Sequence, residues 1–115
     1  MSVSERESGA VTIIDVAGNL TQGAAEDALR DKVGSLLQRG RKNVLVNLGG
    51  VPYMDSTGLG TLIAAHTTAS RQGGALKLLN LTTRLQEILT SSKLLNVFDC
   101  FDDEETAVRS FSAPV

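Results

Sequence analysis

Two aliphatic hydroxyl groups, a carboxylate and two glycines lie close together in the segment spanning residues 51–60. Asp55, Ser56 and Thr57 are consecutive, and Gly58 and Gly60 follow them. A serine or threonine hydroxyl is an acceptor for a phosphoryl group, and a neighbouring carboxylate is suited to orienting such a hydroxyl or an incoming kinase. The chemistry that these residue types favour is therefore covalent modification of an exposed serine.

The flanking sequence predicts where these side chains lie. The preceding segment 43–48 is short, mostly apolar and rich in β-branched residues, which is typical of a buried strand. From Leu59 onward, apolar residues recur at helical spacing. Asp55 and Ser56 are then expected at the entrance of a helix that begins at about Ser56. Aspartate and serine are also favoured N-caps, each worth about 1 kcal/mol over alanine, so a purely structural role for either residue stays open.

Strand and helix patterns alternate along the rest of the chain. The periods predict strands at 11–18, 43–48, 75–80 and 97–101, a shorter strand at about 3–7, and helices at 23–39, 56–72, 83–91 and after the acidic run 102–105. Such alternation is typical of an α/β domain. We therefore expect a mixed, mostly parallel sheet of four to five strands, an antiparallel opening pair and about four helices.

Length and composition restrict the classes of function. A chain of 115 residues is expected to form one domain, 1–115. Its net charge of -2 and aromatic content of 3% provide neither a basic surface for phosphates nor stacking surfaces for bases, so nucleic acid is not an expected partner. The sequence has no apolar run of membrane-spanning length and no secretory signal pattern, so we expect a cytoplasmic protein without direct membrane insertion.

The segment from Met54 to Gly60 resembles the signature of the STAS domain, the fold of bacterial anti-sigma factor antagonists. The resemblance extends over roughly residues 10–110, because further ordered matches occur at 18–20, 72–78 and 93–98. It implies a single STAS domain with a core at roughly 10–110.

The resemblance also implies a function. In antagonists of this family, the serine after the aspartate is phosphorylated by the partner anti-sigma factor serine kinase, and Ser56 is the matching residue. The protein would bind the kinase when unphosphorylated and be released on phosphorylation, and a phosphatase would reset Ser56. Thr57 is a less favoured second acceptor. The expected partner-binding residues are Asp55, Ser56, Thr57, Gly58, Gly60 and Thr21.

Three of these positions have a second interpretation. Gly58 and Gly60 suit either a close approach of a partner backbone or tight packing of the helix on the sheet. Thr21 is also a candidate cap for the first helix. Asn19 and Thr21 stand where many antagonists place a glutamate and an aspartate, so the partner or the phosphorylation rate is expected to differ. The alternative function is that of a constitutive STAS subunit of a transporter complex or a signalling scaffold.

An enzymatic function is not expected. Gly58 and Gly60 begin like a dinucleotide fingerprint, but Ile63 occupies the position of the third glycine. His66 is the single histidine and falls on the apolar stripe of its predicted helix, which favours a partly buried structural role over a catalytic triad. Cys100 is expected to be a buried structural thiol. Without clusters of cysteine or histidine, neither a metal site nor a cofactor is predicted.

Overall fold

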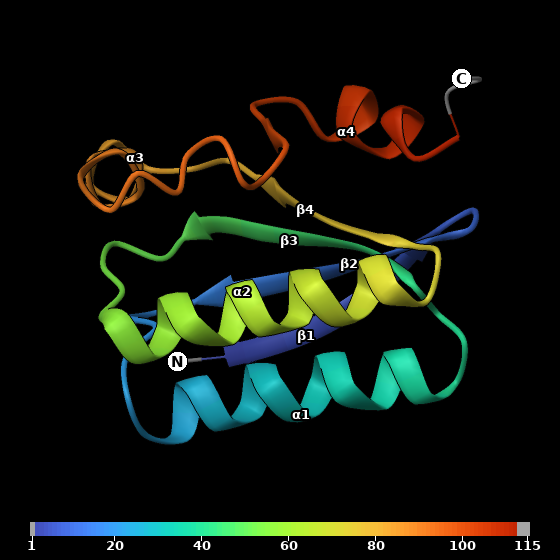
Figure 1. Cartoon of the computed structure of the whole chain (residues 1–115), viewed down its shortest axis with the longest axis horizontal. Coiled ribbons are helices and arrows are strands. Elements are labelled where there is room, and N and C mark those ends of the chain that lie inside the picture. Colours follow the sequence, from blue (N-terminus) through green and yellow to red (C-terminus); the bar gives the residue numbers. More distant parts are fainter. Residues whose placement is uncertain (1, 113–115) are drawn as a thin grey trace.

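A computed structural model describes residues 2–112 of the chain. Strands and helices alternate after an opening pair of strands (Figure 1). In chain order the elements are β1 (Ser2–Ser8), β2 (Val11–Ala17), α1 (Ala24–Gln38), β3 (Asn43–Gly50), α2 (Ser56–Arg71), β4 (Ala75–Leu79), α3 (Thr83–Ser91), β5 (Cys100–Phe101) and α4 (Glu104–Ser110).

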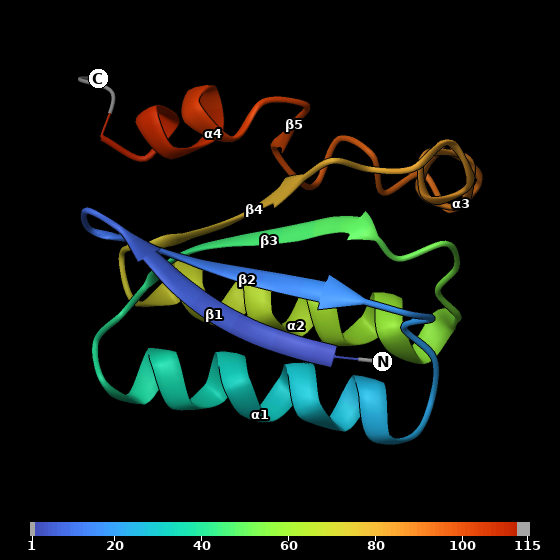
Figure 2. The same cartoon turned by 180° about the vertical axis from the view of Figure 1, so that it is seen from behind.

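The five strands form one sheet in the order β1-β2-β3-β4-β5. β1 and β2 are antiparallel, whereas β2–β3, β3–β4 and β4–β5 are parallel. Figure 2 shows this opening pair in front of α2. The predicted fold class, a mixed and mostly parallel sheet with an antiparallel opening pair and four helices, is confirmed.

The predicted strand at 97–101 is too long. Only Cys100 and Phe101 pair with β4. The preceding residues form a turn, in which the Val97 N–H donates to the carbonyl of Leu94 at 3.0 Å. This turn directs the buried Phe98 side chain into the core, so the apolar pattern of this segment reflects burial rather than strand pairing.

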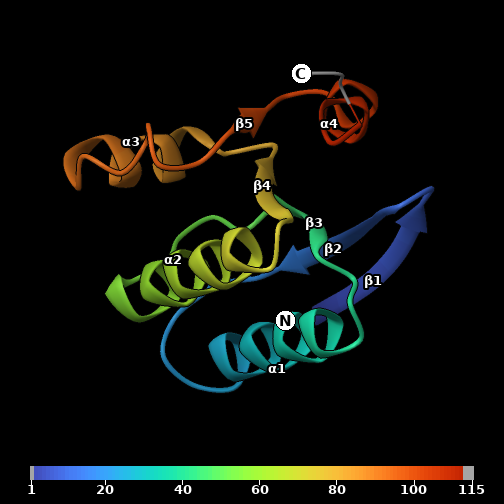
Figure 3. The same ribbon diagram turned by 45° about the vertical axis from the view of Figure 1, so that its right-hand side comes forward.

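Side chains alternate between the two faces of the sheet, and both faces are covered. On one face, Ile14, Val46 and Leu78 belong to the larger core, into which α1 and α2 pack. On the other face, Ile13 and Leu45 belong to a smaller core completed by α4. Figure 3 shows α1 and α2 side by side on one side of the strands and α4 on the other.

Charged side chains hold the N-terminal edge strand against the last helix. Arg6 on β1 forms ion pairs with Asp15 on β2 and with Glu104 on α4. These contacts lower the pKa of both carboxyl groups, because the guanidinium stabilises their ionised forms. The contact between Arg6 and Glu104 joins residues 98 positions apart and connects α4 to β1.

Candidate functional site

Two loops meet at the carboxyl end of the parallel strands. The loop after β2 and the loop after β3 are linked by backbone hydrogen bonds, from the Leu20 N–H to the Tyr53 carbonyl at 2.9 Å and from the Asp55 N–H to the Leu20 carbonyl at 3.3 Å. Leu20 and Met54 also form a parallel bridge. This pairing extends the sheet beyond its regular strands and places Asp55 at the junction of both loops.

The Asp55 side chain links the two helix entrances. Its Oδ1 accepts a hydrogen bond from the Gly58 N–H at 2.9 Å, which caps α2. Its Oδ2 accepts one from the Gln22 N–H at 2.9 Å, in the turn before α1. The donors at Gln22 and Gly58 lower the pKa of this carboxyl group, since they stabilise its ionised form. Asp55 is therefore ionised at neutral pH and holds both loops in place.

Ser56 is the first residue of α2, directly after the cap. Its side chain is exposed, and its hydroxyl makes no hydrogen bond to any of residues 2–112. Neither oxygen of Asp55 bonds to this hydroxyl, and both accept hydrogen bonds from backbone N–H groups instead. Of the two candidate caps, Asp55 is the one that caps the helix, and the Ser56 hydroxyl faces solvent. Thr57 is half-buried and faces the neighbouring helix.

The two glycines have opposite surroundings. A Cβ on Gly58 would lie 2.2 Å from the Leu20 carbonyl oxygen, so this glycine allows α2 to approach the loop after β2. A Cβ on Gly60 would meet nothing within 4 Å, and Gly60 is exposed. Internal packing explains Gly58 and does not explain Gly60.

Thr21 does not cap α1, and the capping interpretation of this residue is wrong. The N-cap is Gly23, with φ 128° and ψ -148° and no side-chain cap. That backbone conformation is accessible essentially to glycine alone, so the turn from Thr21 to Gly23 separates the threonine from the helix. Thr21 is half-buried in the loop whose backbone meets Asp55.

A buried carboxylate lies beside this site, and sequence reasoning assigned it no functional role. Glu26 on α1 is 4% exposed, and its Oε1 accepts hydrogen bonds from Arg30 at 2.7 Å and from the Thr61 hydroxyl at 2.5 Å. The spacing of Glu26 and Arg30 predicts their ion pair, which is confirmed. The contact with Thr61 spans 35 positions and leaves no signal in the sequence.

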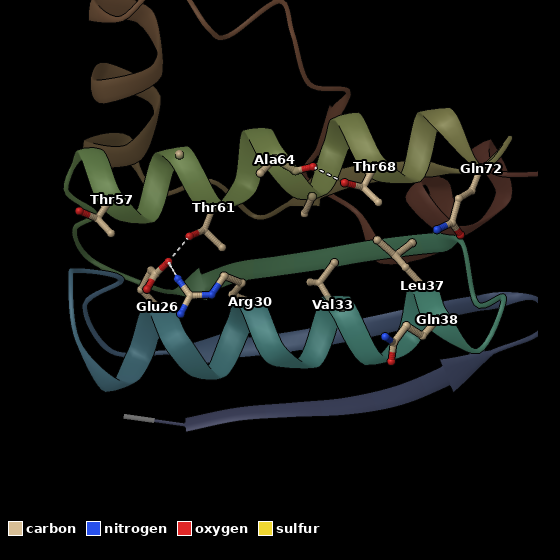
Figure 4. A pocket seen from close by; sticks show the side chains of 13 residues that line it. Glu26, Arg30, Val33, Leu37, Gln38, Thr57, Thr61, Ala64, Thr68 and Gln72 are labelled. Carbon is tan, nitrogen blue, oxygen red and sulfur yellow. Dashed lines mark hydrogen bonds and ion pairs between the residues drawn. The ribbon is translucent and has the colours of Figure 1, made fainter.

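Glu26 and Thr61 line one end of a groove between α1 and α2 (Figure 4). The groove has a volume of about 550 Å³ and is lined mainly by apolar atoms. Thr57 and Gly60 belong to its wall, so it begins next to Ser56. Its lining residues on α1 are Glu26, Arg30, Val33, Gly34, Leu37 and Gln38.

An exposed aromatic side chain flanks the site on the other side. Tyr53 is 39% exposed and lies under the guanidinium of Arg84, which is 5.6 Å from the ring centroid. Sequence reasoning gave Tyr53 no role, although exposed tyrosines are enriched in protein interfaces. Its place in the loop after β3 puts it on the same edge as Asp55.

His66 is a structural residue, as its helical position predicted. Its Nδ1 lies 3.4 Å from the Leu76 carbonyl oxygen, and its ring contacts Phe98 in a T-shaped arrangement with centroids 5.2 Å apart. It lies ten residues along α2 from Ser56, about 15 Å along the helix axis, which is too far for the two to act together. A Ser-His-Asp arrangement is thus excluded for Ser56.

Cys100 is exposed, and the prediction of a buried thiol is wrong. The short strand β5 lies at the edge of the sheet, so one side of it has no neighbouring strand. Partial desolvation and the carboxylates of Asp99 and Asp102 raise the pKa of the Cys100 thiol, which keeps it protonated.

Among residues 2–112, no three histidine, cysteine, aspartate or glutamate side chains come together in a way that would hold a metal ion. Within the same range, each helix is too short or too polar to cross a bilayer.

The family model of the STAS domain matches residues 2–107. The chain belongs to the STAS domain family. Its mixed five-stranded sheet and four helices are therefore the STAS fold.

A curated relative and two solved proteins have similar chains. The anti-sigma-B factor antagonist of Bacillus subtilis is 33% identical over 96 residues, which cover 84% of this chain and 86% of that protein. An anti-sigma factor antagonist (STAS) domain protein from Planctomyces limnophilus has a TM-score of 0.86 at 16% identity, with 96% and 98% of the two chains covered. The anti-sigma factor antagonist SpoIIAA has TM-scores of 0.75 unphosphorylated, over 98% of this chain and 100% of that one, and 0.76 phosphorylated, over 95% and 98%, both at 20% identity.

Proposed function

We propose that this STAS domain is an anti-sigma factor antagonist that acts by partner switching. Unphosphorylated, it binds an anti-sigma factor serine kinase through the surface around Ser56 and so frees a sigma factor. Phosphorylation of Ser56 ends the contact, and a phosphatase restores it. The protein acts as a regulator through binding and has no catalytic activity of its own.

The observation that carries this proposal is the exposed hydroxyl of Ser56 at the entrance of α2, which has no hydrogen-bond partner in the described part of the chain. A kinase needs an accessible hydroxyl on a surface that it can contact, and Ser56 meets this requirement without any local unfolding. The relative from Bacillus subtilis named anti-sigma-B factor antagonist, at 33% identity, supports the same function. Asp55, Thr57, Gly58, Gly60 and Thr21 surround the serine as the remaining proposed contact residues.

The fold tolerates a phosphate at this position. Phosphorylation adds about 1.5 to 2 negative charges, and the amino end of a helix favours negative charge. The Asp55 carboxylate opposes the phosphate, but Ser56 is exposed, so solvent and salt screen the repulsion. Phosphorylation is therefore expected to change the surface of the protein and to leave its fold intact.

The phosphate on Ser56 would lower the affinity for the partner through its effect within the complex. A dianion buried against apolar or acidic groups of a partner loses its hydration without gaining new hydrogen bonds. A penalty of roughly 3 kcal/mol lowers affinity about a hundredfold, which is enough to release the partner. Asn19 and Thr21 replace two acids found in many antagonists, so a kinase matched to this chain would meet less negative charge next to Ser56.

The test is a pull-down from host lysate with wild type, Ser56→Ala and Ser56→Asp, followed by mass spectrometry of the retained proteins. Ser70→Asp adds the same charge at an exposed serine near the other end of α2 and serves as the control. Circular dichroism of each variant verifies the fold. Incubation of wild type with the recovered kinase and ATP, followed by peptide mass spectrometry, locates the phosphate at Ser56 or Thr57.

Recovery of an anti-sigma factor kinase with wild type, Ser56→Ala and Ser70→Asp, but not with Ser56→Asp, would support the proposal. Recovery of transporter subunits or a scaffold with all four proteins would favour the constitutive STAS subunit instead and would reject partner switching at Ser56.

A further inference from the structure

The outward face of α2 carries no charge along almost its whole length. Between Ser56 and Ser70 the helix contains no aspartate, glutamate, lysine or arginine, although charged residues make up 21% of the chain. Three of its exposed positions, Gly60, Ala64 and Thr68, also line the groove, whereas the exposed Ser70 does not. A helix face that stays in water is normally polar and charged, whereas the centres of protein interfaces are depleted of charge. This face therefore has the composition of a contact surface.

The groove between α1 and α2 runs beside this face and is long enough to hold a short helix. Its lining extends from Thr57 to Gln72 on α2, which is about 22 Å along the helix axis. On α1 it extends from Glu26 to Gln38, about 18 Å. Gly60, Ala64 and Gly34 are small, so the backbone of a bound segment can approach closely. A helix of about three to four turns matches this length.

One end of the groove contains the ion pair of Glu26 and Arg30. Both hydrogen bonds to Glu26 go to Oε1, while Oε2 has no hydrogen-bond partner among residues 2–112 and is not among their fully buried unpaired atoms (Figure 4). Asp27, which lies next to the groove and outside its lining, also pairs with Arg30, so the three side chains together carry one net negative charge. The excess negative charge and the free acceptor are complementary to a basic donor group of a partner.

We propose that a helix of the anti-sigma factor lies along the groove between α1 and α2, with small apolar side chains against Gly60 and Ala64 and a lysine or arginine at Glu26. This inference rests on the proposed function, because it assigns the partner that binds at Ser56. Thr57 and Gly60 line the groove within one turn of Ser56, so one bound helix would continue from the phosphorylation site along α2.

Photo-crosslinking in the host separates this inference from the proposed function. The crosslinking residue p-benzoylphenylalanine replaces Ala64 in the groove, Tyr53 beside Ser56, or Ser70 as an exposed control on α2 outside the groove lining. After irradiation, mass spectrometry identifies the crosslinked protein and the crosslinked peptide. The expected result is the same anti-sigma factor at positions 53 and 64, little product at 70, and a peptide from an amphipathic helix containing lysine or arginine.

Four results would overturn the inference. A crosslink to the anti-sigma factor at 53 but not at 64 would reject the groove and leave the proposed function standing. A different protein at 64, or a peptide of the anti-sigma factor that is not a basic amphipathic helix, would also reject it. Absence of the anti-sigma factor at both positions would reject the inference together with the proposed function.

Affinity measurements with the purified anti-sigma factor give a second, quantitative test. Ala64→Arg fills the groove with a long charged side chain, and Ser70→Arg adds the same side chain outside it. Isothermal titration is expected to show affinity at least about tenfold weaker for Ala64→Arg and within about twofold of wild type for Ser70→Arg. Equal affinities for both variants, each folded by circular dichroism, would overturn the inference.

Discussion

The two helix entrances at the carboxyl edge of the sheet are built differently. α2 begins after an aspartate that caps its first turn, and the exposed hydroxyl of the next residue, Ser56, has no hydrogen-bond partner among residues 2–112. α1 begins after Gly23, which caps nothing with a side chain, and the loop before it is held by Asp55 from the other entrance. One carboxylate thus organises both loops.

The residues around the α2 entrance therefore have two different roles. Asp55 and Gly58 fix the geometry through contacts with Gln22 and Leu20, so they are constrained by the fold. Ser56 lies between them in sequence and is free of such constraints. A rigid support with one exposed hydroxyl is suited to a switch, because chemistry on the hydroxyl changes the surface without disturbing the support.

The largest expected effect comes from breaking the contact between the two entrances. Gly58→Ala would place a Cβ 2.2 Å from the Leu20 carbonyl oxygen, and overpacking against backbone is expected to cost about 3 kcal/mol or more. Urea denaturation measures the loss. Gly60→Ala is the matched control, which is expected to be neutral or to stabilise by up to about 1 kcal/mol, since its Cβ meets open space in a helix. Equal stabilities of the two variants would contradict the role of Gly58.

At the α1 entrance, the expected loss of stability comes from backbone strain and not from packing. Gly23→Ala puts an L-residue at φ 128° with nothing within 4 Å of its Cβ, so the expected loss of about 1 to 3 kcal/mol is conformational strain alone. Gly34→Ala, in the middle of α1, is expected to gain up to about 1 kcal/mol. Thermal denaturation compares the two, and a stable Gly23→Ala protein would show that this turn is easily rebuilt.

The link between the entrances predicts a pH effect. The pKa of Asp55 is lowered in the folded protein, so its contribution to stability is present above the unfolded pKa of about 4 and is lost as pH falls through the folded pKa. Asp55→Asn keeps a capping oxygen but removes the charge. The stability difference between wild type and variant is therefore expected to shrink between about pH 5 and pH 2 in urea titrations. A difference independent of pH would refute this role.

Arg6 provides an internal control for that titration. Asp15 and Glu104 also have lowered pKa values, since both pair with Arg6, far from Asp55 in the sequence. Their acid dependence is expected to persist in Asp55→Asn. If the stability of Asp55→Asn no longer depended on pH in this range, Asp55 would act on the whole fold and not only on the two loops.

The smallest expected effect on stability comes from the exposed serine. Ser56→Ala removes a hydroxyl without hydrogen-bond partners among residues 2–112, so the free energy of unfolding is expected to stay within about 0.5 kcal/mol of wild type. Urea denaturation of both proteins checks this. A loss above about 1 kcal/mol would show that Ser56 has a structural role, and the contrast with Asp55 would then disappear.

Local patterns were sufficient for much of the fold. Apolar periodicity predicted α1, α2 and the three central strands, because each buries one stripe or both faces in a core. The same reasoning failed at residues 97–101, where apolar side chains are buried in a turn. The capping interpretation of Thr21, which depended on residue type, failed because a glycine-dependent turn precedes the helix. In both cases the residue types suited the expected feature, while the backbone took another path.

Local patterns also predicted one part of the candidate site and not the other. The position of Asp55 and Ser56 at a helix entrance follows from the strand and helix patterns on either side. The second hydrogen bond of Asp55, to Gln22, does not, because it joins residues 33 positions apart through a backbone N–H that carries no sequence signal. The different surroundings of Gly58 and Gly60 likewise depend on which loop lies opposite each of them.

The sequence by itself determined the elements, their alternation and the exposed serine at the start of α2, since these depend on residues close together in the chain. Only the tertiary structure decided that Asp55 holds two loops, that Gly58 touches the Leu20 carbonyl, and that Glu26 and Thr61 close one end of a groove. These contacts join residues about 30 or more positions apart, and such pairs meet only when the sheet has brought their helices to one face.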